Sequence, residues 1–420
     1  MNEVYLGLDL CRKYIQLSYF CEGKDEPESI FQLNNTETYQ LPNVMFYSVK
    51  EQKWYIGNQV KDVQDKQNGI LVKDLLQHID SSEHVLIEDK DFTYEELLLL
   101  LLKLHIEAFL KREDEEEKQL VALAITLENY QPKVYQVLQR LREELGFSEE
   151  QFYVMSHENA FFQYMMHQDE RLRTNSVAMF EYGKQGMQYY RIDKKQQSGT
   201  AVYLLDYVDL HEEIPYSLLI ENPEKLDKVF AENARTQLQK TFISTVYLTG
   251  QGFNEEWIKE STKVLCAGRR VFLGQNIYTK GACYQAKLLY EKKDYGCVLC
   301  EGKSILYDIG VSVGEMEGRN HVHLIAAGGR EWYNTKGKAT LFLDETNRID
   351  IVYQNKVTKE IQKEVIEIHG LPKRPPKTTK ISIEIEMLDE KTGAIVIRDV
   401  GFGKIYPTTR KIYRKEFTLA

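Results

Sequence analysis

The chain has few cysteines and no long apolar run, and both shortages restrict what it can be. Six cysteines in 420 residues are too few for a disulfide framework, and we expect them to be reduced. The longest apolar run, Leu97–Leu102, is flanked by Glu96 and Lys103 and is far shorter than the roughly 18–20 residues of a membrane helix. The opening MNEVYLGLDL has no basic segment, so it does not resemble a signal peptide. We therefore expect a cytoplasmic protein with no membrane partner.

Basic residues are fewer than acidic residues. The 54 Lys and Arg residues face 64 Asp and Glu residues, which gives a net charge of -10. An acidic chain of this kind argues against nucleic acid as a partner. One local exception is the stretch 371–420, with eleven Lys and Arg residues against six Asp and Glu residues.

The common catalytic signatures are absent. The sequence holds no H-E-x-x-H, G-x-S-x-G or P-loop motif, which removes the simplest enzyme assignments. Cys297 and Cys300 form a C-x-x-C pair upstream of His321 and His323, and four such side chains suit zinc. The intervening strands and the tight H-x-H spacing instead favour two buried cysteines of one strand.

Strand and helix patterns alternate in the first 300 residues. A strand pair at 4–8 and 15–20 precedes a capped helix at 94–111, and then strands at 120–126 and 152–155 each precede a helix. The second stretch repeats this outline, with strands at 177–182, 188–192, 202–208 and 245–248 and a helix at 223–240. This alternation predicts an α/β fold with parallel strands. No repeat of the sequence itself is visible, so the similarity of the two stretches is architectural.

The pattern changes after about residue 300. Short segments with apolar residues at every second position follow one another, separated by turns such as Gly328-Gly329 and 372–376. The expected strands are 321–325, 339–343, 348–353, 364–368, 381–387 and 394–399. Short strands at this spacing predict a β-sandwich.

The order of several short motifs resembles the 70-kDa heat-shock chaperone family of the actin-like ATPase superfamily. Each motif is weak alone, but all follow the family's order: Tyr5–Leu10, Leu41–Val44 with Ile56–Asn58, Val72–Leu75, Phe92–Leu97, His157–Tyr164, Val177–Gly186, Val246–Gly252, Leu306–Ile309 and 370–389. The resemblance implies an actin-like fold of two lobes around a cleft, with residues 1–172 as lobe I and 173–300 as lobe II with a reduced subdomain. Residues 301–420 would be a lid-less sandwich that resembles the family's peptide-binding domain.

The resemblance also implies a nucleotide site for ATP or ADP with Mg²⁺. By position, the nucleotide-binding residues are Asp9, Arg12, Lys13, Gly183, Lys184, Gly186, Gly250 and Gly252. Lys73, Glu158 and Glu181 take the catalytic positions, and Asp9 and Glu181 would hold Mg²⁺ through water.

The phosphate loops depart from the family's pattern. A Gly-Thr-Thr turn is replaced by Cys11-Arg12-Lys13, and Lys184 and Gln185 replace glycines of the second loop. Two interpretations stay open: the basic side chains contact phosphate in place of the lost backbone amides, or they fill an empty cleft. Any ATPase activity is then weak, and a pseudo-ATPase is favoured.

The sequence therefore predicts a chaperone-like protein that binds unfolded or extended polypeptide, or a specific protein partner, through the sandwich. The apolar segment 305–309 is expected to be the linker that couples the lobes to the sandwich. Two alternatives stay open. One is an active ATPase or small-molecule kinase of the same superfamily, and the other is a scaffold or assembly protein without enzymatic activity.

Overall fold

The computed structural model describes residues 2–30, 32–34, 36–111, 118–197, 200–316, 319–344 and 347–419. The chain forms two compact units. The first contains Met1–Ile192 and Tyr207–Tyr295, and the second contains Asp193–Asp206 and Gly296–Ala420. The predicted mixed α/β character is confirmed. Within the described residues, no helix has both the length and the hydrophobicity needed to span a membrane.

A mixed sheet opens the first unit. Its strands are β1 (Asn2–Leu10), β2 (Tyr14–Cys21), β3 (Glu28–Ser29), β12 (Lys118–Leu127) and β13 (Phe152–Ser156), with β6 (Leu41–Pro42) paired to β2. Their order is β13-β12-β1-β2-β3, in which β1 and β2 form an antiparallel hairpin and β12 and β13 add parallel to β1. The second half of β12 and all of β13 are buried, as expected for parallel strands covered on both faces.

A second sheet, most of whose strands lie in the first unit, repeats this strand order. Its strands are β14 (Ser176–Gly183), β15 (Gly186–Gln197), β16 (Thr200–Asp209), β17 (Ile243–Thr249) and β18 (Arg270–Leu273). They are ordered β18-β17-β14-β15-β16, again with an antiparallel hairpin extended by two parallel strands, and β19 (Cys297–Cys300) pairs with β16 as the sixth strand. Residues 193–206 of β15 and β16, together with β19, belong to the second unit. The halves 2–167 and 176–290 therefore share one topology, although no sequence repeat is visible.

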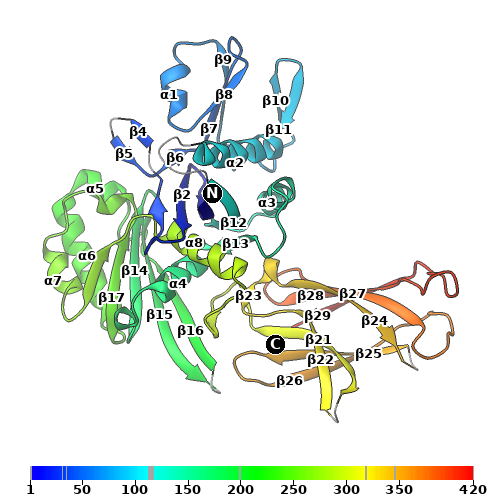
Figure 1. Ribbon diagram of the computed structural model, residues 1–420. Helices are drawn as coiled ribbons and strands as arrows, with labels where there is room; N and C mark the ends of the chain where they lie inside the picture. The colour runs from blue at the N-terminus through cyan, green and yellow to red at the C-terminus, as the bar shows by residue number, and fades with distance from the viewer. Residues whose placement is uncertain are drawn as a thin grey trace. The chain divides into compact units, whose positions relative to one another are not determined.

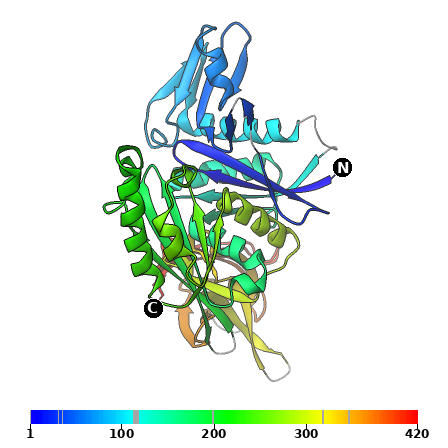
Figure 2. The ribbon, with the colours of Figure 1, turned by 90° about the vertical axis from the view of Figure 1, so that its left-hand side faces the viewer.

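Two helices lie between these sheets, α4 (His157–His167) and α8 (Ile277–Tyr290) (Figures 1 and 2). Their close approach depends on glycine. A Cβ atom added to Gly281 of α8 would lie 1.9 Å from the carbonyl oxygen of Ala160 in α4, and one added to Gly7 of β1 would lie 2.0 Å from that of Thr279. Any other residue would bring a Cβ atom that collides with these carbonyl oxygens. The two glycines therefore allow α8 to pack closely on α4 and β1.

The remaining elements of the first unit are helices on the outer faces and insertions. The helices are α1 (Gln59–Val63), α2 (Tyr94–Leu110), α3 (Pro132–Glu144), α5 (Ser217–Glu221), α6 (Pro223–Leu238) and α7 (Glu260–Leu265), with 3₁₀ turns at Glu170–Leu172 and Gln251–Phe253. The inserted strands are β4 (Gln32–Asn34), β5 (Thr36–Thr38), β7 (Val44–Ser48), β8 (Lys53–Ile56), β9 (Gly69–Lys73), β10 (His84–Ile87) and β11 (Lys90–Thr93). The expected capped helix is confirmed, because Thr93 and Glu96 form a capping box at the start of α2.

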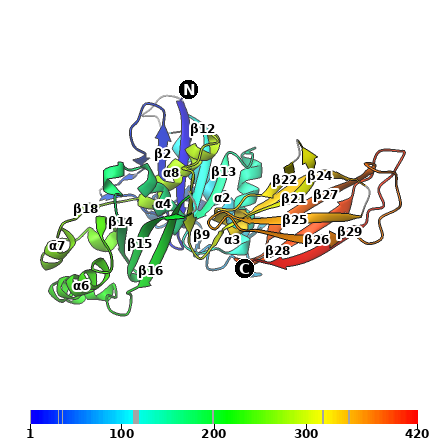
Figure 3. The ribbon, with the colours of Figure 1, turned by 90° about the horizontal axis from the view of Figure 1, so that it is seen from below.

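The second unit consists mainly of two antiparallel sheets. One has the order β22-β21-β25-β26 and the other β24-β27-β28-β29 (Figure 3). Their strands are β21 (Tyr307–Met316), β22 (Arg319–Ala326), β24 (Lys336–Leu343), β25 (Arg348–Asn355), β26 (Ile361–Glu367), β27 (Thr379–Met387), β28 (Thr392–Asp399) and β29 (Ile412–Thr418). The sheets share one core rich in isoleucine, which is the arrangement of a β-sandwich. The short strands β19 (Cys297–Cys300), β20 (Ser304–Ile305) and β23 (Arg330–Glu331) and a 3₁₀ turn at Trp332–Asn334 complete this unit.

Two predictions about this region are wrong. The segment 305–309 is not a linker: Ile305 belongs to β20, Ile309 belongs to β21, and both side chains are buried in the sandwich core. Cys297 and Cys300 do share the strand β19, but they are half-buried and not buried.

Candidate functional site

Two carboxylates occupy matching positions in the two halves of the first unit. Asp9 lies on β1 opposite Thr126 of β12, and Glu181 lies on β14 opposite Thr249 of β17. Each carboxylate thus stands at the end of the first strand of its half, beside a threonine of the parallel neighbour. The shared topology places the two side chains toward the helices that separate the sheets.

Asp9 is fully engaged in hydrogen bonds. His157 Nε2 lies 2.7 Å from Oδ1, Thr126 Oγ1 donates to the same oxygen at 2.8 Å, and the Cys11 thiol donates to Oδ2 at 3.3 Å. The side chain of Asp9 is 1% exposed. Burial favours a higher pKa for Asp9, but the charge and hydrogen bond of His157, with those of Thr126 and Cys11, bring it below its ordinary value.

His157 completes a buried ion pair. Burial favours a lower pKa for the imidazole, but the charge and hydrogen bond of Asp9 raise it to about 9. His157 is the first residue of α4, directly after the N-cap Ser156. A positive charge at a helix N-terminus opposes the helix dipole, so the carboxylate of Asp9 is what holds the imidazolium at this position.

Glu181 makes the equivalent contact in the second half. The hydroxyl of Tyr278, the second residue of α8, donates to its Oε2 at 2.5 Å. Burial raises the pKa of Glu181 above its ordinary value, although the charge of His157 and the bond from Tyr278 act in the opposite sense. Each half therefore joins its strand carboxylate to a residue at the N-terminus of its own inter-sheet helix.

The two rings close this network at its centre. His157 and Tyr278 stack with ring centroids 3.9 Å apart and planes 10° from parallel. The series Asp9–His157–Tyr278–Glu181 thus runs continuously from one sheet to the other. The rings occupy the space between the two carboxylates that the sequence predicted would hold Mg²⁺ and phosphate.

The predicted basic phosphate ligands point elsewhere. Lys13 forms an ion pair with Asp74, and the guanidinium of Arg12 donates to Gln77 at 3.0 Å. Both basic side chains are exposed, and together they attach the β1–β2 turn to the segment after β9. Lys73 is exposed at the end of β9.

The other predicted residues lie along β14, β17 and the start of α4. Gly183 has open space around it, Lys184 is exposed in the β14–β15 turn, and Glu158 is half-buried on α4. Gly186 lies against His211, with a positive φ of 95°. Gly250 lies against the backbone of Tyr182, and Gly252 lies against its ring, so the close approach that these two glycines permit is to Tyr182.

This conformation does not suit a magnesium nucleotide. Both oxygens of Asp9 are already bonded, and hydrated Mg²⁺ needs room for several water molecules. The carboxylates of Glu128 and Glu158 add negative charge near Glu181 and His157. These carboxylates would repel a phosphate group, and Arg12 and Lys13, which bond to Gln77 and Asp74, do not offset the repulsion.

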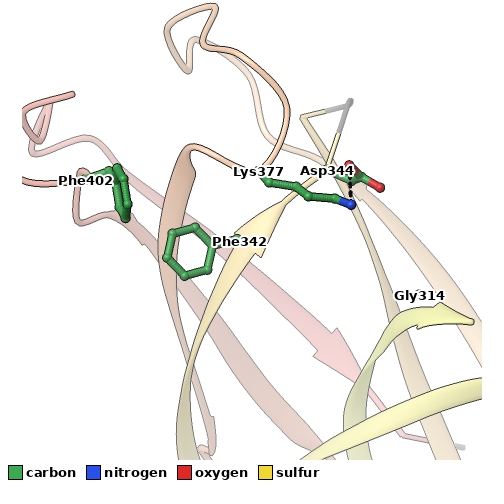
Figure 4. Close-up of a pocket in the computed structure, with 5 residues that line it drawn as sticks. All are labelled: Gly314, Phe342, Asp344, Lys377 and Phe402. Atoms are coloured by element: carbon green, nitrogen blue, oxygen red, sulfur yellow. Dashed lines mark ion pairs between the residues drawn. The ribbon is translucent and has the colours of Figure 1, made fainter. Parts of the chain in front are cut away.

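The second unit offers a separate candidate binding surface. Gly314, Phe342, Asp344, Lys377 and Phe402 line an open hollow of about 490 Å³ (Figure 4). The rings of Phe342 and Phe402 meet edge to face at 5.7 Å, and the two side chains remain 48% and 44% exposed. An exposed aromatic pair in a hollow is typical of a binding surface.

The surroundings of this hollow are basic. The segments 370–380 and 400–411 contribute Lys377 and Phe402 to its lining and contain no Asp or Glu. Apart from Arg374, which is buried in an ion pair with Asp399, they carry the following basic residues: Lys373, Lys377, Lys380, Lys404, Arg410 and Lys411. Of these, Lys377 pairs with the lining residue Asp344 at 4.0 Å. Lys380 Nζ lies 5.8 Å from the centroid of the Phe342 ring, a cation–π distance.

Sequence reasoning missed the two stacked rings. His157 was assigned to a motif in which Glu158 was the functional residue, and no role was predicted for Tyr278. A signal was available: both follow the last strand of their half and begin the inter-sheet helix. Only an alignment of the two halves by topology, and not by residue identity, makes these positions equivalent.

These features define the class of protein: a mixed α/β unit of two similar halves joined by a buried polar network, together with a β-sandwich that bears an exposed aromatic hollow. Residues 26–303 match the family described as "Family of unknown function (DUF5716) C-terminal", and the chain belongs to this family. Residues 304–419 match a second description, "Domain of unknown function (DUF8552)". No curated protein matches the chain.

Proposed function

We propose that this chain is a chaperone-like protein in which a non-hydrolysing, actin-like module carries a polypeptide-binding β-sandwich. The sandwich binds an extended polypeptide that has apolar and acidic side chains. The actin-like module serves as its scaffold.

The repeated topology supports the actin-like assignment. Both halves run hairpin, third strand, helix, strand, helix, strand and helix, and their sheets have the same order. The resemblance to that superfamily also implies a carboxylate at the end of the first strand of each half. Asp9 and Glu181 occupy these positions. The order of motifs that resembles the 70-kDa heat-shock chaperones agrees with this topology.

The stacked rings of His157 and Tyr278 support the absence of hydrolysis. Attack on a phosphate needs a water molecule and a metal ion between the two strand carboxylates, and two rings 3.9 Å apart fill that space. This favours a pseudo-ATPase over an active ATPase or kinase. Calorimetry with Mg-ATP and Mg-ADP on the intact chain is expected to give no binding heat, and saturable heat would refute this part of the proposal.

The exposed pair of Phe342 and Phe402 is the observation that carries polypeptide binding. The two rings are 48% and 44% exposed and meet edge to face in one hollow, so they present a joint apolar surface to a ligand. Extended peptides bind by placing apolar side chains in such hollows. The basic segments around the hollow favour acidic side chains at the flanking positions of the peptide.

Fluorescence anisotropy with labelled peptides tests this function. An acidic peptide with leucine and phenylalanine is expected to bind the intact chain more tightly than a basic peptide with the same apolar residues. Phe402→Ala removes one wall of the hollow and is expected to weaken binding by about 10-fold, since a buried aromatic contact contributes roughly 1–2 kcal/mol.

Phe242→Ala is the matched control, because Phe242 is an 85% exposed aromatic residue of the first unit. Its peptide affinity is expected to equal that of the unmodified chain. Equal losses in both variants, or no binding of either peptide, would refute polypeptide binding at the hollow. Light scattering that reports a large assembly without peptide would favour the scaffold or assembly alternative.

A further inference from the structure

The polar network of the first unit contains a set of side chains that suits a metal ion of another kind. Asp9, Cys11 and His157 present one carboxylate oxygen, one thiol sulfur and one imidazole nitrogen, all within 4.8 Å of one another. The three residues are almost completely buried, with Asp9 at 1%, Cys11 at 5% and His157 at 5% exposure.

The local structure explains how these donors converge. Asp9 lies near the end of β1, and Cys11 is the first residue after this strand. Because they are two positions apart in extended backbone, their side chains leave on the same face. His157 arrives from the far side of β12, since β13 runs parallel to β12 and α4 begins directly after it. Thr126 on β12 lies between them and donates to Asp9 at 2.8 Å, a bond that orients the carboxylate as the hydrogen-bond partners of metal ligands do.

The donor types select the ion. Mg²⁺ prefers oxygen ligands and keeps its water, whereas thiolate and imidazole suit Zn²⁺ and similar ions. In a tetrahedral zinc site, the nitrogen and oxygen ligands lie about 3.3 Å apart. His157 Nε2 and Asp9 Oδ1 lie 2.7 Å apart, and Cys11 Sγ and Asp9 Oδ2 lie 3.3 Å apart. Small side-chain movements are therefore enough to admit an ion in place of the proton that His157 and Asp9 share.

The electrostatic surroundings favour a cation. The carboxylates of Glu128, Glu158 and Glu181 lie near enough to add negative charge around the donor group. The nearby basic residues Arg12 and Lys13 are bonded to Gln77 and Asp74. The negative field that disfavours phosphate thus attracts a divalent cation.

We propose that Asp9, Cys11 and His157 bind a single zinc-type divalent cation, with water in the fourth coordination position. Binding displaces the thiol proton of Cys11 and the proton that His157 shares with Asp9, so two protons leave for each ion bound. The ion would replace a hydrogen bond by a metal bridge between β1 and α4. This inference is independent of polypeptide binding by the sandwich.

Cobalt spectroscopy on the intact chain tests the site. The chain is first stripped with a chelator, and Co²⁺ is then added as a probe whose thiolate charge-transfer band reports sulfur ligation. One ion per chain with a charge-transfer band, displaced by one equivalent of Zn²⁺, is the expected result. Cys11→Ser is expected to abolish the band, and His157→Gln is expected to weaken Zn²⁺ binding by at least about 10-fold.

The double variant Cys297→Ser/Cys300→Ser is the matched control, because these half-buried cysteines form the C-x-x-C pair of the second unit. It is expected to keep the band unchanged. Circular dichroism without metal establishes that each variant is folded, and if Cys11→Ser is unfolded, His157→Gln decides the result alone. Absence of the band in the unmodified chain, its loss in the double variant, or full Zn²⁺ affinity in folded His157→Gln would each overturn the proposal.

Discussion

Replacing Asp399 by asparagine should destabilise the second unit and release the segment that carries Phe402. Asp399 ends β28 and forms a two-pronged ion pair with Arg374, with Nη1–Oδ1 and Nη2–Oδ2 distances of 2.9 and 3.0 Å. Its oxygens also accept the backbone N–H groups of Gly401 and Thr409 and the hydroxyl of Thr409. One buried carboxylate therefore holds both ends of the segment 400–411.

The size of the effect follows from burial. The side chains of Arg374 and Asp399 are only 4% and 0% exposed. Breaking a buried ion pair by neutralising one partner costs about 3–5 kcal/mol, because the other charge stays buried without compensation. Asp399→Asn is therefore expected to lower the free energy of unfolding of the second unit by about that amount, and to weaken peptide binding at the hollow.

The pH dependence has a definite sign. Burial alone would raise the pKa of Asp399, but the hydrogen bonds from Arg374 and Thr409 bring it below its ordinary value. A carboxyl group whose pKa is lower in the folded state stabilises the fold above its unfolded pKa, and this stabilisation is lost as the pH falls through the folded pKa. Acid should therefore destabilise the unmodified chain more than it destabilises Asp399→Asn.

Chemical denaturation of the intact chain, monitored at neutral and acidic pH, measures both effects. Asp350→Asn is the control, because Asp350 pairs with Arg348 at the surface of the same unit and an exposed pair contributes about 0–1 kcal/mol. Equal destabilisation by Asp399→Asn and Asp350→Asn would refute the reasoning. So would an acid dependence that Asp399→Asn leaves unchanged.

Three further predictions concern the first unit. In metal-free protein, the free energy of unfolding should fall as the pH rises from about 6.5 through 9. The pKa of His157 is raised to about 9 in the folded state, so its ion pair with Asp9 is lost over this range. Denaturation curves at several pH values measure this. Gly281→Ala should strongly lower the melting temperature, since the added Cβ would lie 1.9 Å from a carbonyl oxygen of α4, whereas Gly302→Ala has no atom within 4 Å and should not. Asp227→Ala should cost about 2–3 kcal/mol in denaturation experiments, because its carboxylate accepts three successive backbone N–H groups at the start of α7, while Glu232→Ala on the exposed face of α6 should cost little.

Most of the element order was predictable from the sequence. The helix expected at 94–111 is α2, Tyr94–Leu110, and the strand expected at 177–182 is β14, Ser176–Gly183. These elements depend on local periodicity and capping residues, which the sequence displays directly. The ten-residue strand β21 was missed, because its first residues, 307–309, were interpreted as part of a linker.

The candidate site was predictable only in part. Asp9 and Glu181 were identified, because a carboxylate at the end of a strand is visible in the sequence. The partners of Arg12 and Lys13 were not, since Gln77 and Asp74 lie more than 60 residues away along the chain. The role of Gly281 was equally hidden, because only packing shows which backbone lies against a glycine.

The sequence by itself determined the succession of strands and helices, the two similar halves and the change to short strands after residue 300, because each of these follows from side-chain periodicity within a few residues. Tertiary structure decided what fills the space between the halves. His157 and Tyr278 are 121 positions apart, and they meet only because α4 and α8 begin at equivalent points of two sheets that face each other. A contact of that kind depends on how sheets and helices pack, and no local pattern in the sequence encodes it.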